Sequence, residues 1–362
     1  MRVLLIDLNG PFGPLRSFVE LLPAFKSLGV AVEFVVPDRS LDLLDEVAPH
    51  ASVFVVNRRH SLRRDWEVSR IVQSRLAAGT HIVHANSTTA VRGASLGALI
   101  KCAPLVVHLR NSSLSRLERS MLRSVARLPG KVRYIAVSKG AADLVGRMPE
   151  GLVTTLGDPV SAPQPRGPRG WNEPPRIGVV LNQLPTKGLD IFVDIVSILK
   201  GLNIQWEVFG SAGEKSSTSK YVVDSIERLE RLQINGGIRY MGVVPSMSSV
   251  FCSLDVALVT SRRESFSRIC AEALLAGTPL VAPDIPGLID TVDGGRLAQM
   301  YPPGDPAAAA ASIRRVLNDL PSALDRSRTG MQWGSGKFSP EVVAVEMAGI
   351  YRGILCGPGP AT

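Results

Sequence analysis

Short apolar runs alternate with amphipathic stretches along most of this chain. In the first half, the apolar runs begin at Arg2, Ala31, Ser52, His81, Leu105 and Tyr134. A helix-forming stretch around Phe18–Leu28 separates the first two runs. Strands that alternate with helices favour a parallel, doubly wound α/β sheet. We therefore predict such a sheet for residues 1–160.

The alternation stops between residues 161 and 175, where recurring Pro residues break both helices and sheet ladders. It resumes with the apolar runs that begin at Arg176 and Gln205. A chain of 362 residues is long enough to form two cores. The pattern therefore predicts two domains, at residues 1–160 and 176–335, joined by a linker at 161–175.

The segment from Val256 to Ala282 carries the clearest candidate chemistry. An apolar strand at 257–259 ends in a polar loop that contains Glu264, and the helix that follows contains Glu272. Ligands of open α/β sheets bind at the carboxyl ends of the strands. Leu274 and Leu275 follow Glu272, and a carboxylate among apolar residues is costly unless hydroxyls or cations satisfy it. A bound ribose or sugar would supply the hydroxyls; the alternative is a solvent-facing Glu272 and a helix-capping Glu264.

Together with Arg239–Gly242 before it and Pro286–Asp290 after it, this segment resembles the donor-binding half of the family 4 glycosyltransferases. The resemblance extends over nearly the whole chain. It implies the GT-B fold, in which two Rossmann-like doubly wound domains face each other across a cleft. Residues 1–160 would then bind the acceptor and 176–335 the nucleotide-sugar donor, and a helix within 336–362 would cross back to the first domain. The resemblance also implies a retaining reaction.

The family's donor-site residues can be carried over by position. In that family the first glutamate contacts the donor sugar, the second binds the ribose hydroxyls, and backbone amides after the first hold sugar hydroxyls. On this basis the donor-binding residues are Gly13, Asn182, Lys187, Gly210, Ser265, Phe266, Ser267, Arg268 and Glu272. The catalytic residues are His108, Lys187 and Glu264. Ser267 stands where the family usually has Gly, so we expect a different fit around the sugar.

Lys187 and Gly188 match the family's Lys-Gly pair, whose lysine neutralises the donor diphosphate as a point charge. Asn182 stands where the family usually has Arg. Either an arginine from the loop after the 257–259 strand replaces it, or the diphosphate is held less strongly. The candidate arginines are Arg262, Arg263 and Arg268.

His108 ends the strand that begins at Leu105 and resembles the family's histidine beside the acceptor. A histidine there can hydrogen bond a sugar hydroxyl at neutral pH. The alternative is a buried histidine satisfied by the backbone. His84 and Asn86 form a weaker candidate of the same sort. Gly13 belongs to the turn Asn9–Pro14, which resembles the family's first loop, although its prolines reduce the number of N–H donors.

Charge is unevenly distributed along the chain. Residues 1–160 contain 21 Lys and Arg against 13 Asp and Glu, which gives 21 − 13 = +8 of the total +9. Four arginines recur there at helical spacing: Arg116, Arg119, Arg123 and Arg127. Such a face suits an anionic membrane surface or a phosphorylated acceptor, and solvated helix faces have the same pattern. Nucleic acid is not expected as a partner, because aromatic residues make up only 5% of the chain and no stacking motif accompanies the arginines.

Other features complete the prediction. No apolar run approaches the roughly 18 residues of a membrane span, and the start of the sequence lacks a signal pattern. The four cysteines are not spaced as in metal sites. We therefore expect a cytoplasmic protein. If the arginine face binds the membrane, we expect the protein to lie peripherally on its inner face. No Asp-x-Asp metal motif is present, so we expect neither metal nor cofactor beyond the nucleoside-diphosphate sugar co-substrate.

The predicted function is a retaining, metal-independent transfer of a sugar from a nucleoside-diphosphate sugar to an acceptor hydroxyl. The acceptor would be a carbohydrate, a glycolipid or a small molecule, such as a lipid-linked or surface-polysaccharide precursor. Three alternatives stay open: a soluble natural-product acceptor, a subunit that binds the nucleotide sugar without catalysis, and an epimerase on the same fold.

Overall fold

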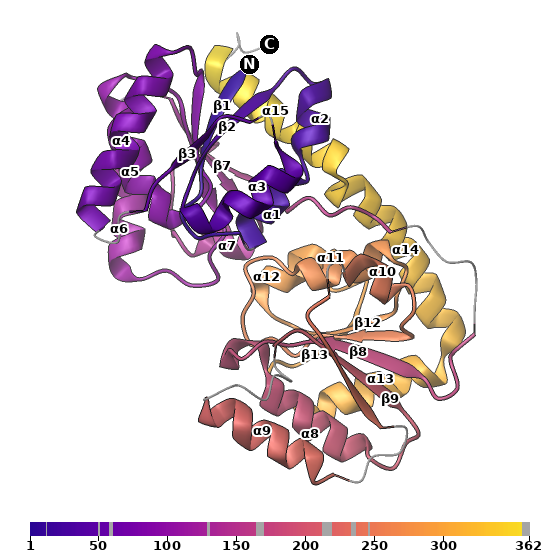
Figure 1. Cartoon of the computed structure of the whole chain (residues 1–362). Coiled ribbons are helices and arrows are strands. Elements are labelled where there is room, and N and C mark those ends of the chain that lie inside the picture. Colours follow the sequence, from indigo (N-terminus) through magenta and orange to yellow (C-terminus); the bar gives the residue numbers. More distant parts are fainter. Residues whose placement is uncertain are drawn as a thin grey trace. The chain divides into compact units, whose positions relative to one another are not determined.

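The computed structural model describes residues 1–11, 13–49, 51–57, 61–128, 131–163, 170–211, 219–232, 237–244 and 247–356. It divides into two compact units. The first contains Met1–Val160 together with Phe338–Thr362, and the second contains Ser161–Lys337. The first unit is therefore assembled from two stretches of chain that lie on either side of the second unit in the sequence (Figure 1).

The first unit contains a seven-stranded, all-parallel sheet of order β3-β2-β1-β4-β5-β6-β7 among the described residues. Its strands are β1 (Arg2–Ile6), β2 (Ala31–Val36), β3 (Val53–Val55), β4 (Ile82–Ala85), β5 (Leu105–Leu109), β6 (Val132–Ala136) and β7 (Val153–Thr155). Its helices are α1 (Gly13–Val19), α2 (Leu22–Ser27), η1 (Asp38–Ser40), α3 (Leu41–Val47), α4 (Ser61–Ala77), α5 (Thr88–Ile100), α6 (Arg116–Val125), α7 (Lys139–Asp143) and α15 (Pro340–Cys356).

Helices cover both faces of this sheet. Leu15, Phe18 and Phe25 of α1 and α2 join Met347 and Tyr351 of α15 in one core cluster with the strands. On the other face, α5 packs on β4 and β5 and is itself packed closely by α4. The close approach of α4 and α5 requires glycine, because a Cβ at Gly93 or Gly97 would lie within 2.7 Å of a valine Cβ of α4.

The second unit contains a six-stranded parallel sheet of order β10-β9-β8-β11-β12-β13 within its described residues. Its strands are β8 (Arg176–Val180), β9 (Gln205–Phe209), β10 (Ile238–Gly242), β11 (Val256–Leu258), β12 (Leu280–Pro283) and β13 (Gln299–Tyr301). Its helices are η2 (Pro185–Lys187), α8 (Leu189–Leu199), α9 (Lys220–Glu230), α10 (Met247–Phe251), α11 (Arg268–Leu275), α12 (Pro286–Ile289), η4 (Asp290–Val292), α13 (Pro306–Asn318) and α14 (Leu320–Phe338), whose last residue belongs to the first unit.

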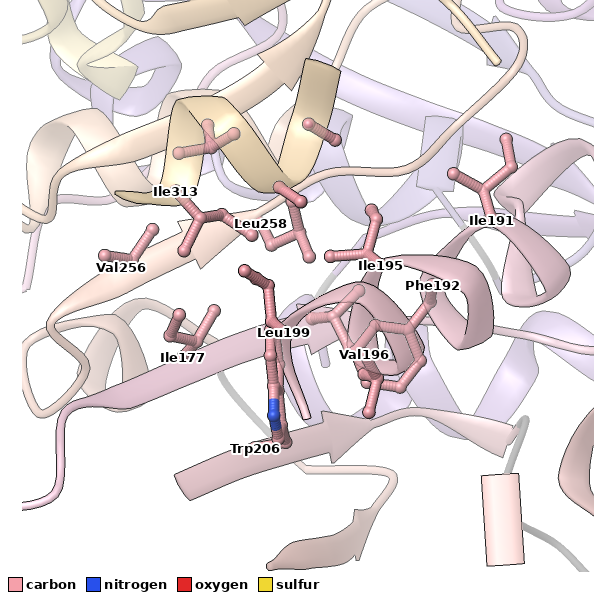
Figure 2. Packing of buried hydrophobic residues seen from close by; sticks show 14 of the residues in the cluster. Ile177, Ile191, Phe192, Ile195, Val196, Leu199, Trp206, Val256, Leu258 and Ile313 are labelled. Carbon is pink, nitrogen blue, oxygen red and sulfur yellow. The ribbon is translucent and has the colours of Figure 1, made fainter. Parts of the chain in front are cut away.

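One of the two apolar clusters described in the second unit is formed by side chains of β8, β9, β11, α8 and α13 (Figure 2). Trp206 of β9 is fully buried there, and its ring meets that of Phe192 of α8 edge to face, with the ring centroids 5.6 Å apart. Edge-to-face pairs add stability beyond area burial. The central strands β8, β11 and β12 are apolar along most of their length, as expected where helices cover both faces of a parallel sheet.

The predicted doubly wound architecture is confirmed for both domains. The predicted helix around Phe18–Leu28 is two helices, α1 and α2, with a turn at Glu20 and Leu21. Pro23 lies in the first turn of α2, where its missing N–H is tolerated, whereas in one continuous helix it would break the hydrogen-bond ladder. Of the predicted linker, residues 164–169 lie outside the described residues. Trp171 and Asn172 are bound to the second unit: the Trp171 indole N–H donates to the carbonyl of Leu317, and Asn172 donates to Asp255.

Candidate functional site

The carboxyl edge of the second sheet has a topological switch point between β8 and β11. The chain leaves β8 towards β9 on one side, whereas β11 pairs with β8 on the other. The loops that follow β8 and β11 therefore diverge and leave room for a ligand, as in other open α/β sheets. Lys187 lies in the first of these loops and Glu264 in the second. The fold thus brings together two residues that are 77 positions apart.

Lys187 and Glu264 form an ion pair at this switch point. The Lys187 Nζ atom lies 2.6 Å from Glu264 Oε1, and the same oxygen accepts a hydrogen bond from the Ser261 hydroxyl at 2.7 Å. The Glu264 side chain is 12% exposed. The carboxylate is therefore held in place by a cation and a hydroxyl, while the ammonium keeps further donors for a ligand.

Two close backbone contacts position this pair. Gly188 has φ +70°, and a Cβ there would lie 2.1 Å from the Thr260 carbonyl oxygen. Thr260 in turn donates its hydroxyl to the Lys187 carbonyl at 2.8 Å. Behind Glu264, a Cβ at Gly287 of α12 would lie 1.9 Å from the Glu264 carbonyl oxygen. Glycine is required at both places because only it leaves room for the opposing backbone.

The helix α11 supplies the second glutamate. Ser267 is its N-cap and accepts from the Cys270 N–H at 3.4 Å. Glu272, on the next turn, is only 8% exposed, and its Oε1 lies 3.2 Å from Arg268 Nη2. The solvent-facing alternative for Glu272 therefore does not hold. Phe266 is buried and Ser265 half-buried where the loop enters the helix.

The structure separates the three arginines that were considered as substitutes at Asn182. Arg262 donates to both carboxylate oxygens of Asp190, at 2.8 and 2.6 Å, and to the carbonyl of Pro185. It therefore clamps the loop that carries Lys187. Arg268 pairs with Glu272, and Arg263 is exposed. Asn182 itself uses its side-chain oxygen to accept from the Leu184 N–H at 3.0 Å, which shapes the same loop.

The clamp predicts a pH-dependent contribution to stability. Burial raises the pKa of Asp190, but hydrogen bonds from Arg262 and Tyr221 outweigh this and lower it to about 2. A lowered folded-state pKa stabilises the fold above the ordinary pKa of 3.8, and that contribution is lost as pH falls towards 2. We expect Asp190→Asn to reduce the free energy of unfolding by about 1 kcal/mol at pH 6, allowing for solvent screening, and by less at pH 3.

Denaturant unfolding of both proteins at the two pH values measures this difference. Asp194→Asn is the matched control, because Asp194 also lies on α8 and also pairs with an arginine, Arg228, but in an exposed position. An Asp190→Asn deficit that is unchanged at pH 3, or one equal to that of Asp194→Asn, would contradict the assignment.

The remaining donor-binding predictions lie in two other loops. Gly210 follows β9 with φ +91°, and a Cβ there would lie 2.2 Å from the Leu181 carbonyl oxygen, so it fixes the path of the chain beside β8. Gly13 begins α1 in the first unit, with φ +25° and open space around its Cβ position. Phe12 of the same turn lies outside the described residues.

A buried polar cluster occupies the carboxyl ends of β1, β4 and β5 in the first unit. The parallel register pairs Leu5 with His84 and His84 with Val106, so alternate residues of these strands share one face. This places Asp7, His84, Asn86, His108 and Arg110 together. The cluster lies at this sheet's own switch point, because β1 connects to β2 on one side and pairs with β4 on the other.

Hydrogen bonds connect the cluster. Asp7 accepts from Asn86 Nδ2 at 2.7 Å, and Asn86 Oδ1 accepts from Arg110 Nε at 3.1 Å. Arg110 also pairs with Asp158. Burial raises the pKa of Asp7 above its ordinary value, although hydrogen bonds from Asn9 and Asn86 partly oppose this.

Two nitrogen atoms of this cluster have no hydrogen-bond partner among the described residues: His108 Nε2 and Arg110 Nη2. Buried polar atoms are nearly always hydrogen bonded, so such atoms indicate a place where a ligand or water binds. The prediction at His108 thus acquires a second donor, Arg110, which was not among the predicted site residues. His108 and Arg110 are two residues apart, as are His84 and Asn86. This spacing puts each pair on one face of its strand, and it points to a shared site only when the register of the strands is known.

The four arginines of the predicted basic face lie on and just after α6. Ser115 and Glu118 form a capping box at the start of this helix. All four arginines are exposed and line one depression of about 380 Å³. Arg123 also donates to the carbonyl of Val145. The anion-binding role of this face stays a prediction.

Two kinds of feature are absent from the described residues. No group of three or more His, Cys, Asp or Glu side chains in them is arranged to hold a metal ion. None of the helices described combines the length and apolar character that crossing a membrane requires.

Comparison with protein families places the second unit. Residues 174–319 match the model of the family described as glycosyl transferases group 1. The chain is 24% identical over 316 residues to the 2-deoxystreptamine glucosyltransferase of Streptomyces kanamyceticus, covering 81% of this chain and 80% of that enzyme. A glycogen synthase of Mycobacterium tuberculosis is 37% identical over 97 residues, 23% of its own length. Five further relatives also match over less than half of their length.

Solved structures share the fold along the whole chain. A glycosyltransferase from Rickettsia africae superposes with a TM-score of 0.83 at 16% identity and covers 99% of both chains. HepE from Anabaena, solved in complex with UDP and glucose, gives a TM-score of 0.80 at 19% identity and covers 97% of this chain and 99% of that one. These similarities and the two parallel-sheet units show a glycosyltransferase with the GT-B fold, and the second unit, which contains Lys187, Glu264 and Glu272, is similar to the group 1 glycosyltransferases.

Proposed function

We propose that this enzyme belongs to the family 4 kind and transfers a sugar from a nucleoside-diphosphate sugar to an acceptor hydroxyl, with retention of anomeric configuration. The observation that carries the proposal is the Lys187–Glu264 ion pair at the switch point of the second sheet, with Glu272 buried on the adjoining helix. The complex of HepE with UDP and glucose adds support for a nucleotide-sugar donor.

The side chains suit the parts of such a donor. The Lys187 ammonium, a compact point charge, would neutralise the diphosphate. Glu264 would accept hydrogen bonds from hydroxyls of the sugar, and Glu272 would accept them from the ribose. Arg268, on the first turn of α11, would hold the Glu272 carboxylate in place. The glutamates supply acceptors and the lysine supplies donors, which is the complement that a sugar and a phosphate require.

The reaction follows from these roles. The bond between the anomeric carbon and the diphosphate oxygen breaks, and the acceptor oxygen forms a bond to the same carbon on the face that the diphosphate leaves. The acceptor's proton passes to an oxygen of the departing diphosphate. Lys187 would stabilise the negative charge that develops there. We propose that this occurs without a metal ion, because the sequence lacks an Asp-x-Asp motif and Lys187 carries the required charge.

A donor panel tests the proposal. Purified protein is incubated with UDP-, GDP-, ADP- and TDP-sugars, with Mg²⁺ or with EDTA, and release of the nucleotide is measured. We expect one nucleotide class to be consumed at similar rates in both buffers. Consumption that stops in EDTA would contradict metal independence. Once an acceptor is identified, the anomeric proton coupling of the glycoside product would reveal inversion instead of retention. Interconversion of donor sugars without any acceptor would instead indicate an epimerase.

The acceptor has two candidate classes. The exposed arginine face of α6 favours an anionic, lipid-linked acceptor at the inner face of the membrane of a cytoplasmic enzyme. The similarity to a 2-deoxystreptamine glucosyltransferase, aligned over four fifths of both chains, favours a small soluble acceptor. Sedimentation with vesicles that contain anionic lipid separates them. Binding that is lost when Arg116, Arg119 and Arg127 are replaced by Gln supports the first class, and indifference to vesicles supports the second.

A subunit that binds the nucleotide without catalysis is the remaining alternative, because Asn182 stands where the family usually has Arg. If no donor is consumed, calorimetric titration with free UDP, GDP, ADP and TDP is the next measurement. Binding of one nucleotide would indicate that the acceptor is missing or that the protein is a binding subunit. Absence of binding to all four would overturn the donor-site assignment.

A further inference from the structure

Three buried side chains of the first unit form a row of hydrogen bonds that the proposed transfer does not use. The Tyr351 hydroxyl lies 2.6 Å from His84 Nδ1, and His84 Nε2 lies 3.3 Å from His108 Nδ1. Tyr351 comes from α15, His84 from β4 and His108 from β5. The row thus connects the last helix of the unit with the histidine that was predicted at the acceptor side.

The row is isolated from water. Tyr351 and His84 are fully buried, and His108 is 2% exposed. The ring of Phe18 meets the His84 ring edge to face at 5.5 Å between centroids, and the ring of Phe25 lies 6.1 Å from that of Tyr351. Burial, reinforced by the positive charge of Arg110, lowers the pKa of His84 to about 3 and the pKa of His108 well below its ordinary value. Both rings are therefore neutral at pH 7, and each carries one N–H.

The direction of the hydrogen bonds follows from the Tyr351 hydroxyl. Within the described part of the chain, His84 Nδ1 is the partner of this hydroxyl. If His84 Nδ1 carried the proton, the hydroxyl would accept it, and its own hydrogen would be buried without an acceptor. The hydroxyl therefore donates to Nδ1, so His84 carries its proton on Nε2 and donates to His108 Nδ1. The proton of His108 is then on Nε2, the atom that has no partner among the described residues.

We infer that Tyr351 is a positioning residue: acting through His84, it fixes His108 as a hydrogen-bond donor at Nε2, directed at a hydroxyl oxygen of a bound substrate. This inference rests on the proposed function for the identity of the ligand. Arg110 Nη2, the second donor of the cluster without a partner in the described part of the chain, belongs to the same site. Both groups donate, so the ligand atoms that they bind are hydrogen-bond acceptors, and His108 does not serve as the base for the acceptor hydroxyl.

The ¹⁵N spectrum of the histidine side chains tests the direction of the row without substrate. The wild-type chain has five histidines, and His84→Gln and His108→Gln assign the two signals by their loss. We expect both rings in the Nε2–H form. Tyr351→Phe removes the hydroxyl that donates to His84 Nδ1, so the proton positions of both rings are no longer fixed. We therefore expect His108 to become a mixture of the Nε2–H and Nδ1–H forms. A wild-type His108 in the Nδ1–H form would overturn the inference.

Kinetics test the positioning role. We expect Tyr351→Phe to lower kcat/KM about tenfold, the effect of one hydrogen bond made to the substrate. Tyr134→Phe is the matched control, because Tyr134 is equally buried in this unit but donates to the backbone carbonyl of Leu122. The control should leave both the histidine spectrum and kcat/KM unchanged.

The outcomes separate the two proposals. If Tyr351→Phe and Tyr134→Phe change kcat/KM alike, Tyr351 has only a structural role and the inference fails. If the wild type consumes no donor and binds none of the four nucleotides, but the histidine forms behave as expected, the proposed function fails while the direction of the row stands.

Discussion

Replacing Lys187 with alanine should lower kcat for sugar transfer by about 10² to 10³-fold, while the protein stays folded. The reason is electrostatic. Lys187 Nζ lies at the switch point of the second sheet, 2.6 Å from Glu264, where charge would develop on the departing diphosphate. Losing one preorganised donor in such a site costs catalysis on this scale. Steady-state kinetics with the donor identified by the panel measures the effect.

Two further variants sharpen this test. Lys187→Arg keeps the charge but replaces a compact ammonium with a longer planar group, so we expect a partial loss, between those of wild type and Lys187→Ala. Lys200→Ala, an exposed lysine at the end of α8 in the same unit, should have no effect. A Lys187→Ala enzyme with near-normal kcat would remove the lysine from the mechanism.

Gly188→Ala should destabilise the second unit by about 3 kcal/mol and reduce activity as well. The new Cβ would lie 2.1 Å from the Thr260 carbonyl oxygen, and the residue would keep a φ of +70°. Left-handed strain and overpacking each cost roughly 1–3 kcal/mol. Because Thr260 also holds the Lys187 carbonyl, relief of the clash would move the lysine away from Glu264.

Tryptophan fluorescence can follow this unit alone. In a Trp66→Phe background the remaining tryptophans, Trp171, Trp206 and Trp333, all belong to the second unit. Gly336→Ala is the control, because its Cβ on α14 would meet no atom within 4 Å, so we expect a gain of about 0.5–1 kcal/mol from helix propensity. Equal stabilities of the two alanine variants in urea would refute the steric argument.

The amino-acid pattern is sufficient to predict the two doubly wound sheets, because strands buried on both faces produce apolar runs that are separated by helices. Through the resemblance to a family, it also predicts that Glu264 and Lys187 belong to one donor site, whereas their ion pair is a finding of the structure. The polar cluster of the first unit could not be derived in this way. Asp7, Asn86 and Arg110 come together through strand register, which alternation within single strands does not specify.

Long-range partners set a similar limit. Tyr351 lies 267 positions from His84, and no local pattern distinguishes it from any other helical tyrosine. Nothing in the sequence favoured Arg262 over Arg263 or Arg268. Its structural role became evident only from its two hydrogen bonds to Asp190 of α8. The roles of His108, Glu264 and Glu272 towards substrate stay predictions until the experiments above are done.

The helix α15 has a consequence for how the protein is made. Its residues Val343, Met347 and Tyr351 complete the core of the first unit, yet the ribosome reaches them only after the entire second unit. The amino-terminal segment must therefore emerge with Phe25 and its neighbours uncovered, whereas the second unit can close as soon as it leaves the ribosome. In a cell, the synthesis of α15 would thus determine when the first unit can complete its core, and a chain interrupted before residue 340 would expose an unfinished apolar surface to chaperones and proteases.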